Sequence, residues 1–344
     1  MKNILEKENK QRLLPKHLAR VVTLLLILLI VSICMSLAFG SRTIGLDGLI
    51  DGLFHPSIES HEASVVRQRI ARTIFGLICG AALGVSGALM QSVTRNPIAD
   101  PSILGVNTGA SLFVVCGIAF LSIHSPSDYI WLAIVGAILT AIFVFGIGSM
   151  GASGATPLKL VLAGAATTAI LSSLVTAILI PRTNVMDQFR FWQVGSVGAA
   201  NWDSVHIFVP FLIVGVVIAI IVAPALNALA LGDEVATGLG VRTGVIRMLA
   251  AFAGVLLCGA ATALAGPIGF IGLLATHLIR LVVGPDVRFL IPLAALSGAI
   301  ILLISDVCGR FLGSPGELEV GILTAFIGAP ILILITMKAK MRTI

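Results

Sequence analysis

Charged residues are scarce in this chain. Asp, Glu, Lys and Arg make up 11% of its 344 residues, whereas a soluble domain carries about 25%. Hydrophobic residues reach 58% and the mean hydropathy is +1.09. This composition excludes an ordinary soluble domain and predicts an integral membrane protein. The apolar runs are about 20 residues long and do not alternate, so we predict all-α spans and not the strands of a barrel.

The motifs of common enzyme sites are also missing. The sequence contains no GxxxxGK[ST] phosphate loop, no HExxH and no GxSxG. The five cysteines form no CxxC pair, so we expect neither a disulfide nor a metal site. These absences predict no enzyme activity, no metal site and no cofactor in this chain. Mid-span carboxylates are nearly absent, which disfavours an ion-coupled secondary transporter, although that alternative stays open.

Hydropathy predicts a cytoplasmic segment at 1–20, a single transmembrane domain at 21–337 and a cytoplasmic tail at 338–344. We expect about ten spanning helices, at 21–40, 69–93, 103–122, 128–150, 158–180, 205–230, 248–265, 269–283, 289–306 and 321–337. An even number of spans puts both termini on one side. The basic N-terminal segment, together with Lys338, Lys340 and Arg342, places that side in the cytoplasm of a multi-pass membrane protein. The net charge of +6 therefore needs no nucleic-acid partner.

The stretch 69–110 organises the chain. Gly76, Gly80, Gly84 and Ala88 recur every four residues and predict a face where another helix packs closely. Such stripes are common in membrane proteins, so the stripe alone does not identify a function. The run then breaks at Asn96-Pro97 and Asp100-Pro101, because proline disfavours helix in the residue before it.

Three further segments carry structural signals. Gly266, Pro267 and Gly269 predict a helix break at membrane depth, which is tolerated only against protein or a water-filled cavity and so favours a transport path. The segment 231–247 is either an ordinary loop or a short helix capped by Asp233 on the cytoplasmic face. The segment 181–203 is either an aromatic anchor or a tight re-entrant turn at a pore mouth.

Three further polar residues have simple interpretations. Asp306 and Arg310 are four residues apart on one predicted helix, so we expect a local ion pair. His277 has no second metal ligand near it in the sequence, and a packing role is favoured over a metal role.

Motifs spread over residues 66–337 occur in a specific order: RIAR, GAALGVSGALMQ, RNPIADPSILGV, LVLAG, WQVGS, LGDEVATGLG, GPIGFIGLLATHLIR and GELEVGILTAFIGAP. This series resembles the FecCD/BtuC-type permease subunits of bacterial ABC importers for iron–siderophore complexes, haem and vitamin B12. The resemblance implies a ten-helix, type II importer permease that forms a dimer with a copy or a homologue. It also implies two ATPase subunits that bind ATP and Mg, an extracytoplasmic binding protein, and a place in the bacterial cytoplasmic (inner) membrane as a multi-pass protein.

The resemblance also assigns roles to residues. Arg69, Arg72 and Arg310 match arginines that dock the binding protein, and Asn96 and Ile98 match positions that constrict the cytoplasmic gate. The residues that match the helix coupling permease to ATPase are Gly232, Asp233, Glu234, Ala236, Gly238 and Gly240.

The chain departs from the family pattern at a few positions. Proline is frequent in the family where this chain has Ala71, Thr276 and Glu319, and hydroxyl residues are expected where Pro157 and Leu158 stand. These departures bear on gating and helix kinking. The expected function is ATP-driven translocation of an iron–siderophore or similar metal chelate by alternating access.

Overall fold

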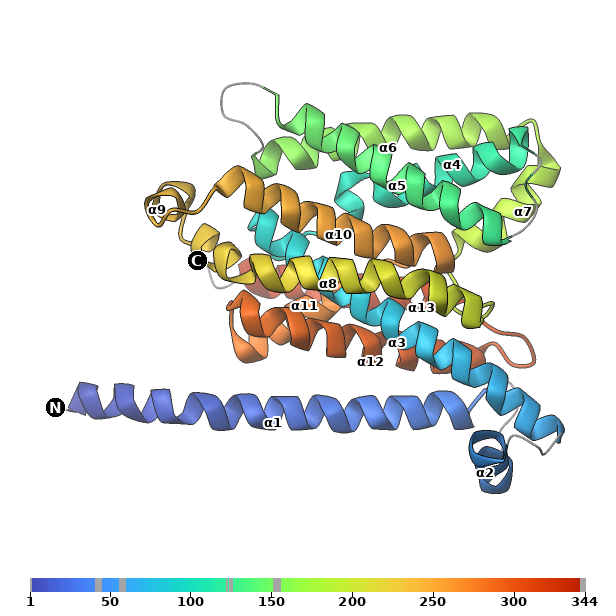
Figure 1. The fold of residues 1–344 in the computed structure, drawn as a ribbon, viewed down its shortest axis with the longest axis horizontal. Coiled ribbons are helices and arrows are strands. Elements are labelled where there is room, and N and C mark those ends of the chain that lie inside the picture. The colour runs from blue at the N-terminus through green and yellow to red at the C-terminus, as the bar shows by residue number, and fades with distance from the viewer. Residues whose placement is uncertain are drawn as a thin grey trace.

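The computed structural model describes residues 2–40, 45–55, 60–121, 123, 126–150 and 156–340. This part of the chain is helical and contains no strand, which confirms the all-α prediction. Most of the long helices lie side by side along one direction (Figure 1). The elements are α1 (Lys2–Ala38), α2 (Leu46–Phe54), α3 (His61–Thr94), η1 (Pro101–Leu104), α4 (Val106–Phe120), α5 (Pro126–Gly148), α6 (Pro157–Leu179), α7 (Thr183–Gln193), α8 (Trp202–Ala230), α9 (Asp233–Gly238), α10 (Thr243–Ala265), α11 (Ile271–Val283), α12 (Val287–Leu312) and α13 (Val320–Lys340).

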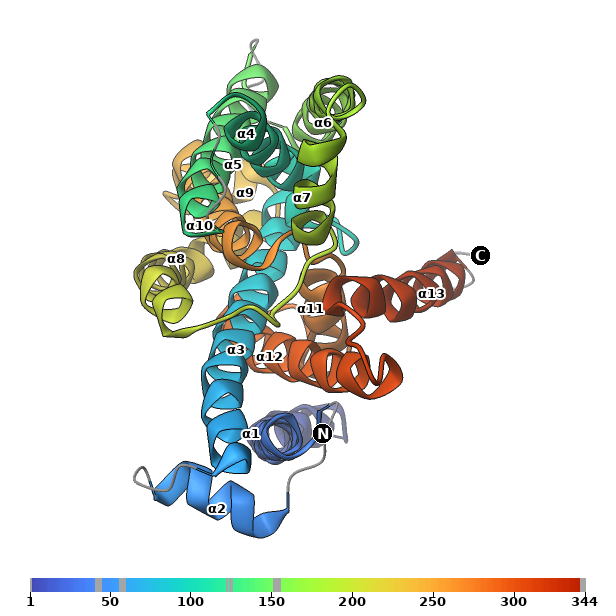
Figure 2. The same ribbon diagram turned by 90° about the vertical axis from the view of Figure 1, so that its right-hand side faces the viewer.

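Seven of the described helices are long and apolar enough to cross a membrane, namely those at 16–38, 61–94, 128–148, 158–179, 202–230, 243–265 and 287–312. Three shorter apolar helices, Val106–Phe120, Ile271–Val283 and Val320–Ile333, fall where the other three spans are expected. Ten spans therefore remain a prediction. The spans of α3 and α10 are 78% buried within the protein, whereas that of α1 is only 11% buried. The centre of the bundle thus lies at α3 and α10 (Figure 2).

The helix boundaries differ from the hydropathy prediction mainly at polar residues. Helix α1 begins at Lys2 and not near residue 21, and α3 begins at His61, where the Ser60 hydroxyl accepts a hydrogen bond from the Ala63 amide. Hydropathy detects the apolar part of a helix and misses its polar ends, because helical hydrogen bonding does not require apolar side chains. The short helices α2 and α7 were not predicted, because 9 and 11 residues are too few to form an apolar run of spanning length.

The small-residue stripe makes the closest helix contact. A Cβ atom on Gly80 would meet the Gly298 carbonyl of α12, and one on Gly84 would meet the Ala294 carbonyl. The next glycine along, Gly87, packs in the same way against the backbone of α11. The predicted packing face is therefore confirmed, and it fixes α3 against α11 and α12 without side chains between the backbones.

The helix break also lies where it was expected, between α10 and α11. Gly266 adopts a φ of +72°, and its Cα faces the Trp192 carbonyl so closely that no Cβ would fit. The Ser196 amide donates to the Ala265 carbonyl at 2.7 Å, and the Gly321 amide donates to the Gly195 carbonyl at 3.0 Å. Segment 194–198 thus covers the break with protein, as an interrupted helix in a membrane requires.

The first described residue of α1 and the last of α13 lie at the same end of the bundle as α9, and α2 and α7 lie at the other end (Figure 1). This arrangement fits termini on one side of a membrane, although the cytoplasmic assignment remains a prediction. Arg342 and the rest of 341–344 lie outside the described residues. So does Met1 of the N-terminal segment.

Candidate functional site

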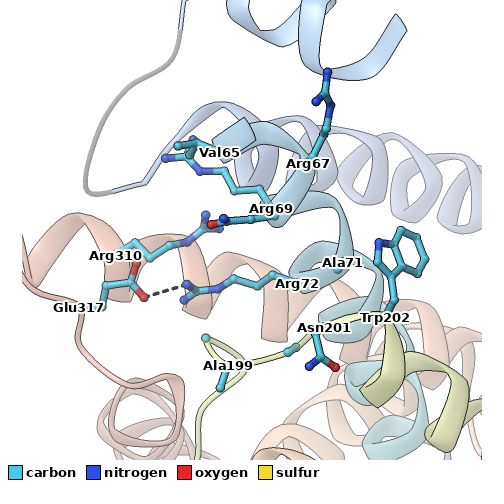
Figure 3. A pocket seen from close by; sticks show the side chains of 13 residues that line it. Val65, Arg67, Arg69, Ala71, Arg72, Ala199, Asn201, Trp202, Arg310 and Glu317 are labelled. Carbon is cyan, nitrogen blue, oxygen red and sulfur yellow. Dashed lines mark hydrogen bonds and ion pairs between the residues drawn. The ribbon is translucent and has the colours of Figure 1, made fainter. Parts of the chain in front are cut away.

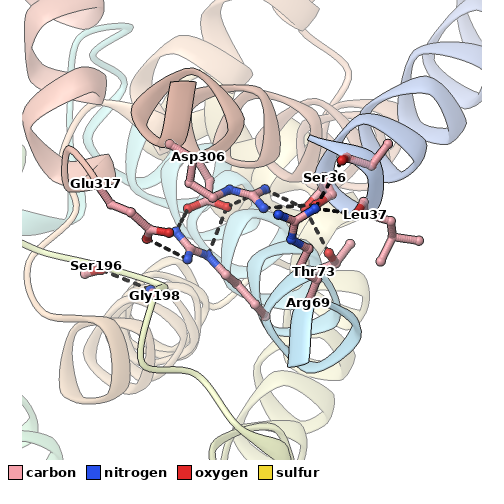
Figure 4. Close-up of polar contacts among 11 residues, drawn as sticks. Ser36, Leu37, Arg69, Thr73, Ser196, Gly198, Asp306 and Glu317 are labelled. Atoms are coloured by element: carbon pink, nitrogen blue, oxygen red, sulfur yellow. Dashed lines mark hydrogen bonds and ion pairs between the residues drawn. The ribbon is translucent and has the colours of Figure 1, made fainter. Parts of the chain in front are cut away.

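Three of the predicted site residues meet at the end of the bundle near α2. Arg69 and Arg72 lie in the first turns of α3, and Arg310 lies in the last turn of α12. With Asp306 and Glu317 they form what we call the arginine cluster (Figure 4). Close packing of α3 on α12 along the glycine stripe sets the distance between these two helices, and so brings together residues that are far apart in the sequence.

Asp306 is the centre of this cluster. Its carboxylate accepts two hydrogen bonds from Arg72, from Nη2 at 2.6 Å and from Nε at 3.2 Å. Arg310 Nη2 lies 3.0 Å from the same carboxylate, which confirms the predicted i,i+4 pair. The remaining edge of Arg72 donates to Glu317 Oε2 at 2.7 Å. One carboxylate therefore pairs with two arginines, and forked pairs of this kind are strong and specific.

The cluster is also tied to the end of α1. Arg310 donates to the Ser36 carbonyl and hydroxyl, each at 3.0 Å, and Arg69 donates to the carbonyls of Leu37 and Ala38 at 3.0 and 3.1 Å. These carbonyls belong to the last turn of α1, where the helix dipole favours positive charge. The guanidinium groups therefore hold α1 against α3 and α12.

A cavity of about 570 Å³ opens beside the cluster (Figure 3). Arg67, Arg69, Arg72 and Arg310 contribute to its wall, together with Glu317 and the 198–202 turn. Arg310 is only 2% exposed and Arg69 only 8%. The wall is basic, as a surface that docks acidic residues requires, but Arg310 is mainly an internal structural residue. The docking role of Arg69, Arg72 and Arg310 remains a prediction.

The predicted coupling residues form a short helix at the opposite end of the bundle. Helix α9 begins after Gly232, whose φ is +115°, and ends at Gly238; Gly240, with a φ of +83°, then reverses the chain. The prediction that Asp233 caps this helix is wrong, because the N-cap is Gly232. The Asp233 carboxylate instead forms ion pairs with two arginines.

Arg95 and Arg247 both pair with Asp233, and we call these three residues the α9 junction. Arg247 Nη2 lies 2.7 Å from Asp233 Oδ1, and Arg95 Nη2 donates to the same oxygen. Partial burial acts to raise the pKa of Asp233, but the hydrogen bonds and charges of Arg247 and Arg95 outweigh it and hold that pKa below its ordinary value. Asp233 therefore stays ionised at neutral pH.

The predicted gate residues follow directly after Arg95. Arg95 ends α3 in a left-handed conformation with a φ of 51°. Asn96 then accepts a hydrogen bond from the Ile98 amide at 3.1 Å, which forms a tight turn, and the Ile98 side chain is 42% exposed. The structure places both residues at the end of α3, where the polypeptide leaves the bundle. Their gating role remains a prediction.

The helix break lies beside a second cavity of about 650 Å³. Its wall includes Trp192, Ser196 and residues 263–265 next to Gly266. Gly266, Pro267 and Gly269 thus lie close to a hollow, although their place on a transport path remains a prediction. Within the described residues no group of three His, Cys, Asp or Glu side chains could hold a metal ion, and His277 belongs to no such group.

Sequence reasoning missed three members of these sites. The sequence alone gives no site role to Arg95, Arg247 or Glu317. Their partners lie far away in the sequence: 138 residues separate Arg95 from Asp233, and 245 separate Arg72 from Glu317. Only residue covariation between homologous sequences could have revealed such pairs beforehand.

A family model, the FecCD transport family, matches residues 28–338. This chain belongs to the FecCD transport family. The ferric enterobactin transport system permease protein FepD of Escherichia coli K12 is 40% identical over 316 residues, covering 91% of this chain and 94% of FepD. The iron(3+)-hydroxamate import system permease protein FhuB of Bacillus subtilis is 38% identical, covering 89% of this chain and 79% of its own length. The hemin transport system permease protein HmuU of Yersinia pestis is 34% identical, covering 79% and 82%.

The fold agrees with a solved structure. An ABC transporter assigned to the metal-chelate type, solved in an inward-facing conformation, superposes with a TM-score of 0.81 at 27% identity, covering 93% of this chain and 99% of that one. This FecCD-family chain is therefore an ABC importer permease, an integral protein of the cytoplasmic membrane, and its role is transport. The predicted family, fold class and function are confirmed.

Proposed function

We propose that this permease imports a ferric siderophore, with a haem- or cobalamin-type chelate as the alternative cargo. The observation that supports this proposal is the 40% identity to a ferric enterobactin permease over nearly the whole of both chains. Relatives at 34–38% identity are named for hydroxamate, citrate and hemin, so cargo chemistry varies within the family. We therefore propose the class of cargo and no single compound.

The permease works, in this proposal, as half of a two-fold pair formed with a second copy or a homologous permease. Two ATPase subunits bind ATP and Mg and contact α9, which is exposed at one end of the bundle. The extracytoplasmic binding protein docks at the arginine cluster through acidic side chains. Ion pairs that form at the open edge of the cavity orient a partner and raise its association rate more than they raise affinity.

Transport then follows from rigid-body motion. Closure of the ATPase pair moves α9, and the two permease subunits rock against each other, so that the path opens to one side at a time. In this scheme the turn with Asn96 and Ile98 closes the cytoplasmic end of the path. The chelate passes without forming a bond to the chain, and the chemistry of ATP hydrolysis stays with the partner subunits.

Uptake by proteoliposomes tests the cargo. The permease is reconstituted with its ATPase subunits, with ATP inside and the binding protein outside, and is offered ferric catecholate, ferric hydroxamate, ferric citrate or haem in turn. We expect accumulation of a ferric siderophore that requires both ATP and the binding protein. Accumulation of haem alone would overturn the siderophore assignment and leave the permease assignment intact.

A further inference from the structure

Helix α9 is a small element with few internal contacts. It contains six residues, and among them Ala236 is buried whereas Val235 is 49% exposed. Leu231 and Leu239, on either side, are 66% and 64% exposed. A helix this short does not hold its own position in water. Its orientation therefore depends on the chain on either side and on the side chains that fasten it to the bundle.

Asp233 connects α9 to two other helices through ion pairs. Arg247 lies in the first turns of α10, and its side chain is 8% exposed, so it is a fixed point within the bundle. Arg95 caps the end of α3, and its side chain is 34% exposed. Both guanidinium groups donate to Oδ1 of Asp233. The carboxylate is therefore a shared contact between α9, α10 and the end of α3.

The Arg95 end of this junction continues directly into the turn that holds the predicted gate. Arg95 has a left-handed backbone, and the next residue, Asn96, fixes the turn by accepting from the Ile98 amide at 3.1 Å. The backbone between Arg95 and Ile98 is therefore short and internally bonded. Arg95 and Ile98 thus belong to one short, hydrogen-bonded turn.

We propose that Asp233 is a positioning residue that transmits the movement of α9 to the Arg95–Ile98 turn. The inference rests on the proposed function, in which ATPase subunits contact α9. Arg247 holds the Asp233 carboxylate at a fixed position against α10. When α9 moves, the pair with Arg95 moves the turn that contains the predicted gate. The Asp233–Arg95 contact thus links the site of ATP-driven movement to the end of the path.

The test uses the full importer in proteoliposomes, with permease, ATPase subunits and binding protein. Asp233→Asn keeps the shape of the side chain and removes its charge, and Arg95→Gln breaks the junction from the gate side while Asp233 still pairs with Arg247. The control is Asp187→Asn, which removes an exposed i,i+3 pair with Arg190 on α7 at the other end of the bundle. The readouts are ATPase co-purification, ATP hydrolysis, cargo imported per ATP, and nucleotide-dependent thiol labelling of Ile98→Cys in a background without the native cysteines.

We expect both junction variants to retain the ATPase subunits and hydrolysis, and to import up to about fivefold less cargo per ATP, because the exposed Asp233–Arg95 ion pair is lost. Labelling of Ile98→Cys should no longer respond to nucleotide, and the Asp187 control should behave as the unmodified importer. Normal import per ATP with normal labelling in either variant would overturn the inference. So would loss of ATPase co-purification in Asp233→Asn, because that result assigns Asp233 to assembly.

The same preparation separates this inference from the proposed function. If the unmodified chain retains no ATPase subunit or imports nothing with ATP, the proposed function fails, and the inference that rests on it fails too. If the unmodified importer works and the junction variants behave like it, only the inference fails. If the unmodified importer works and the variants differ from it as expected, both statements hold.

Discussion

At the scale of single residues, Asp306 is the group on which the arginine cluster depends. It is 3% exposed and is the shared partner of Arg72 and of Arg310, which is 2% exposed. Buried charges are stable only when they are paired and hydrogen-bonded. Removing the shared carboxylate leaves two guanidinium groups in a region from which water is largely excluded.

We therefore expect Asp306→Ala to lower the free energy of unfolding by about 3–5 kcal/mol, the usual cost of breaking a buried ion pair. Glu317→Ala removes a half-exposed partner of Arg72 and should cost about 1 kcal/mol or less. Denaturation of the purified protein in detergent measures both. Equal effects of the two substitutions would contradict the central place given to Asp306.

Glu317 also occupies the edge of Arg72 that faces the cavity. If a carboxylate of the binding protein docks there, it must replace Glu317, whose side chain is 37% exposed. Glu317→Gln should then tighten docking by up to about fivefold, since an exposed ion pair is worth about 1 kcal/mol or less. Surface plasmon resonance at low salt measures this, with Glu319→Gln as the control. Weaker docking of Glu317→Gln would show that Glu317 assists the partner and does not compete with it.

Asp286, directly before α12, gives the stability of the protein a defined response to acid. Hydrogen bonds from Arg288 and Asn227, and the Arg288 charge, lower its pKa from 3.8 to about 2, against the opposing effect of burial. Because the folded pKa lies below the unfolded one, the carboxylate stabilises the protein fully above pH 3.8. That stabilisation is lost as the pH falls through about 2.

The melting temperature of the native protein should therefore exceed that of Asp286→Asn at pH 6, and the difference should shrink as the pH falls from 3.8 towards 2. Thermal unfolding in detergent across this pH range measures the difference. Asp286 is the N-cap of α12, and its side chain accepts a hydrogen bond from the Arg288 amide. A difference that stays constant across the pH range would assign the effect to this capping hydrogen bond and not to the charge of Asp286.

At the scale of the elements, the glycine stripe of α3 determines how closely α12 approaches. Gly84→Ala puts a methyl group into the Ala294 carbonyl, so the helices must separate. We expect a loss of about 1–3 kcal/mol of stability, as overpacking costs elsewhere. Gly146→Ala on α5, where nothing lies within 4 Å of the added Cβ, should be neutral or stabilising by up to about 1 kcal/mol. Equal destabilisation by both alanines would contradict the packing account.

The same helix shows how far the sequence predicts this fold. The four-residue spacing of Gly76, Gly80 and Gly84 was sufficient to predict a packing face, because the spacing reflects local helix geometry. Proline and glycine likewise predicted both breaks. The Arg72–Asp306 contact could not be predicted, because it joins residues 234 positions apart. The capping pattern also predicted the wrong role for Asp233. Its position at the start of a short helix is typical of an N-cap, but its carboxylate pairs with Arg95 and Arg247.

At the scale of the whole molecule, the two polar sites lie at opposite ends of one packed bundle. The arginine cluster fastens α1, α3 and α12 at one end, and the α9 junction fastens α3, α9 and α10 at the other. Helix α3 belongs to both and is among the most buried spans. In the proposed function, binding-protein docking and ATPase movement would therefore act on one common helix.

The central claim is that this permease is driven by ATP through separate subunits. The most direct test is cargo uptake by proteoliposomes that hold the permease with its ATPase subunits and binding protein, compared with liposomes that hold the permease alone under a proton or sodium gradient. We predict uptake in the complete system that depends on ATP, and none by the permease alone on either gradient. Uptake by the isolated permease on an ion gradient without ATP would contradict the account and identify the chain as a secondary transporter.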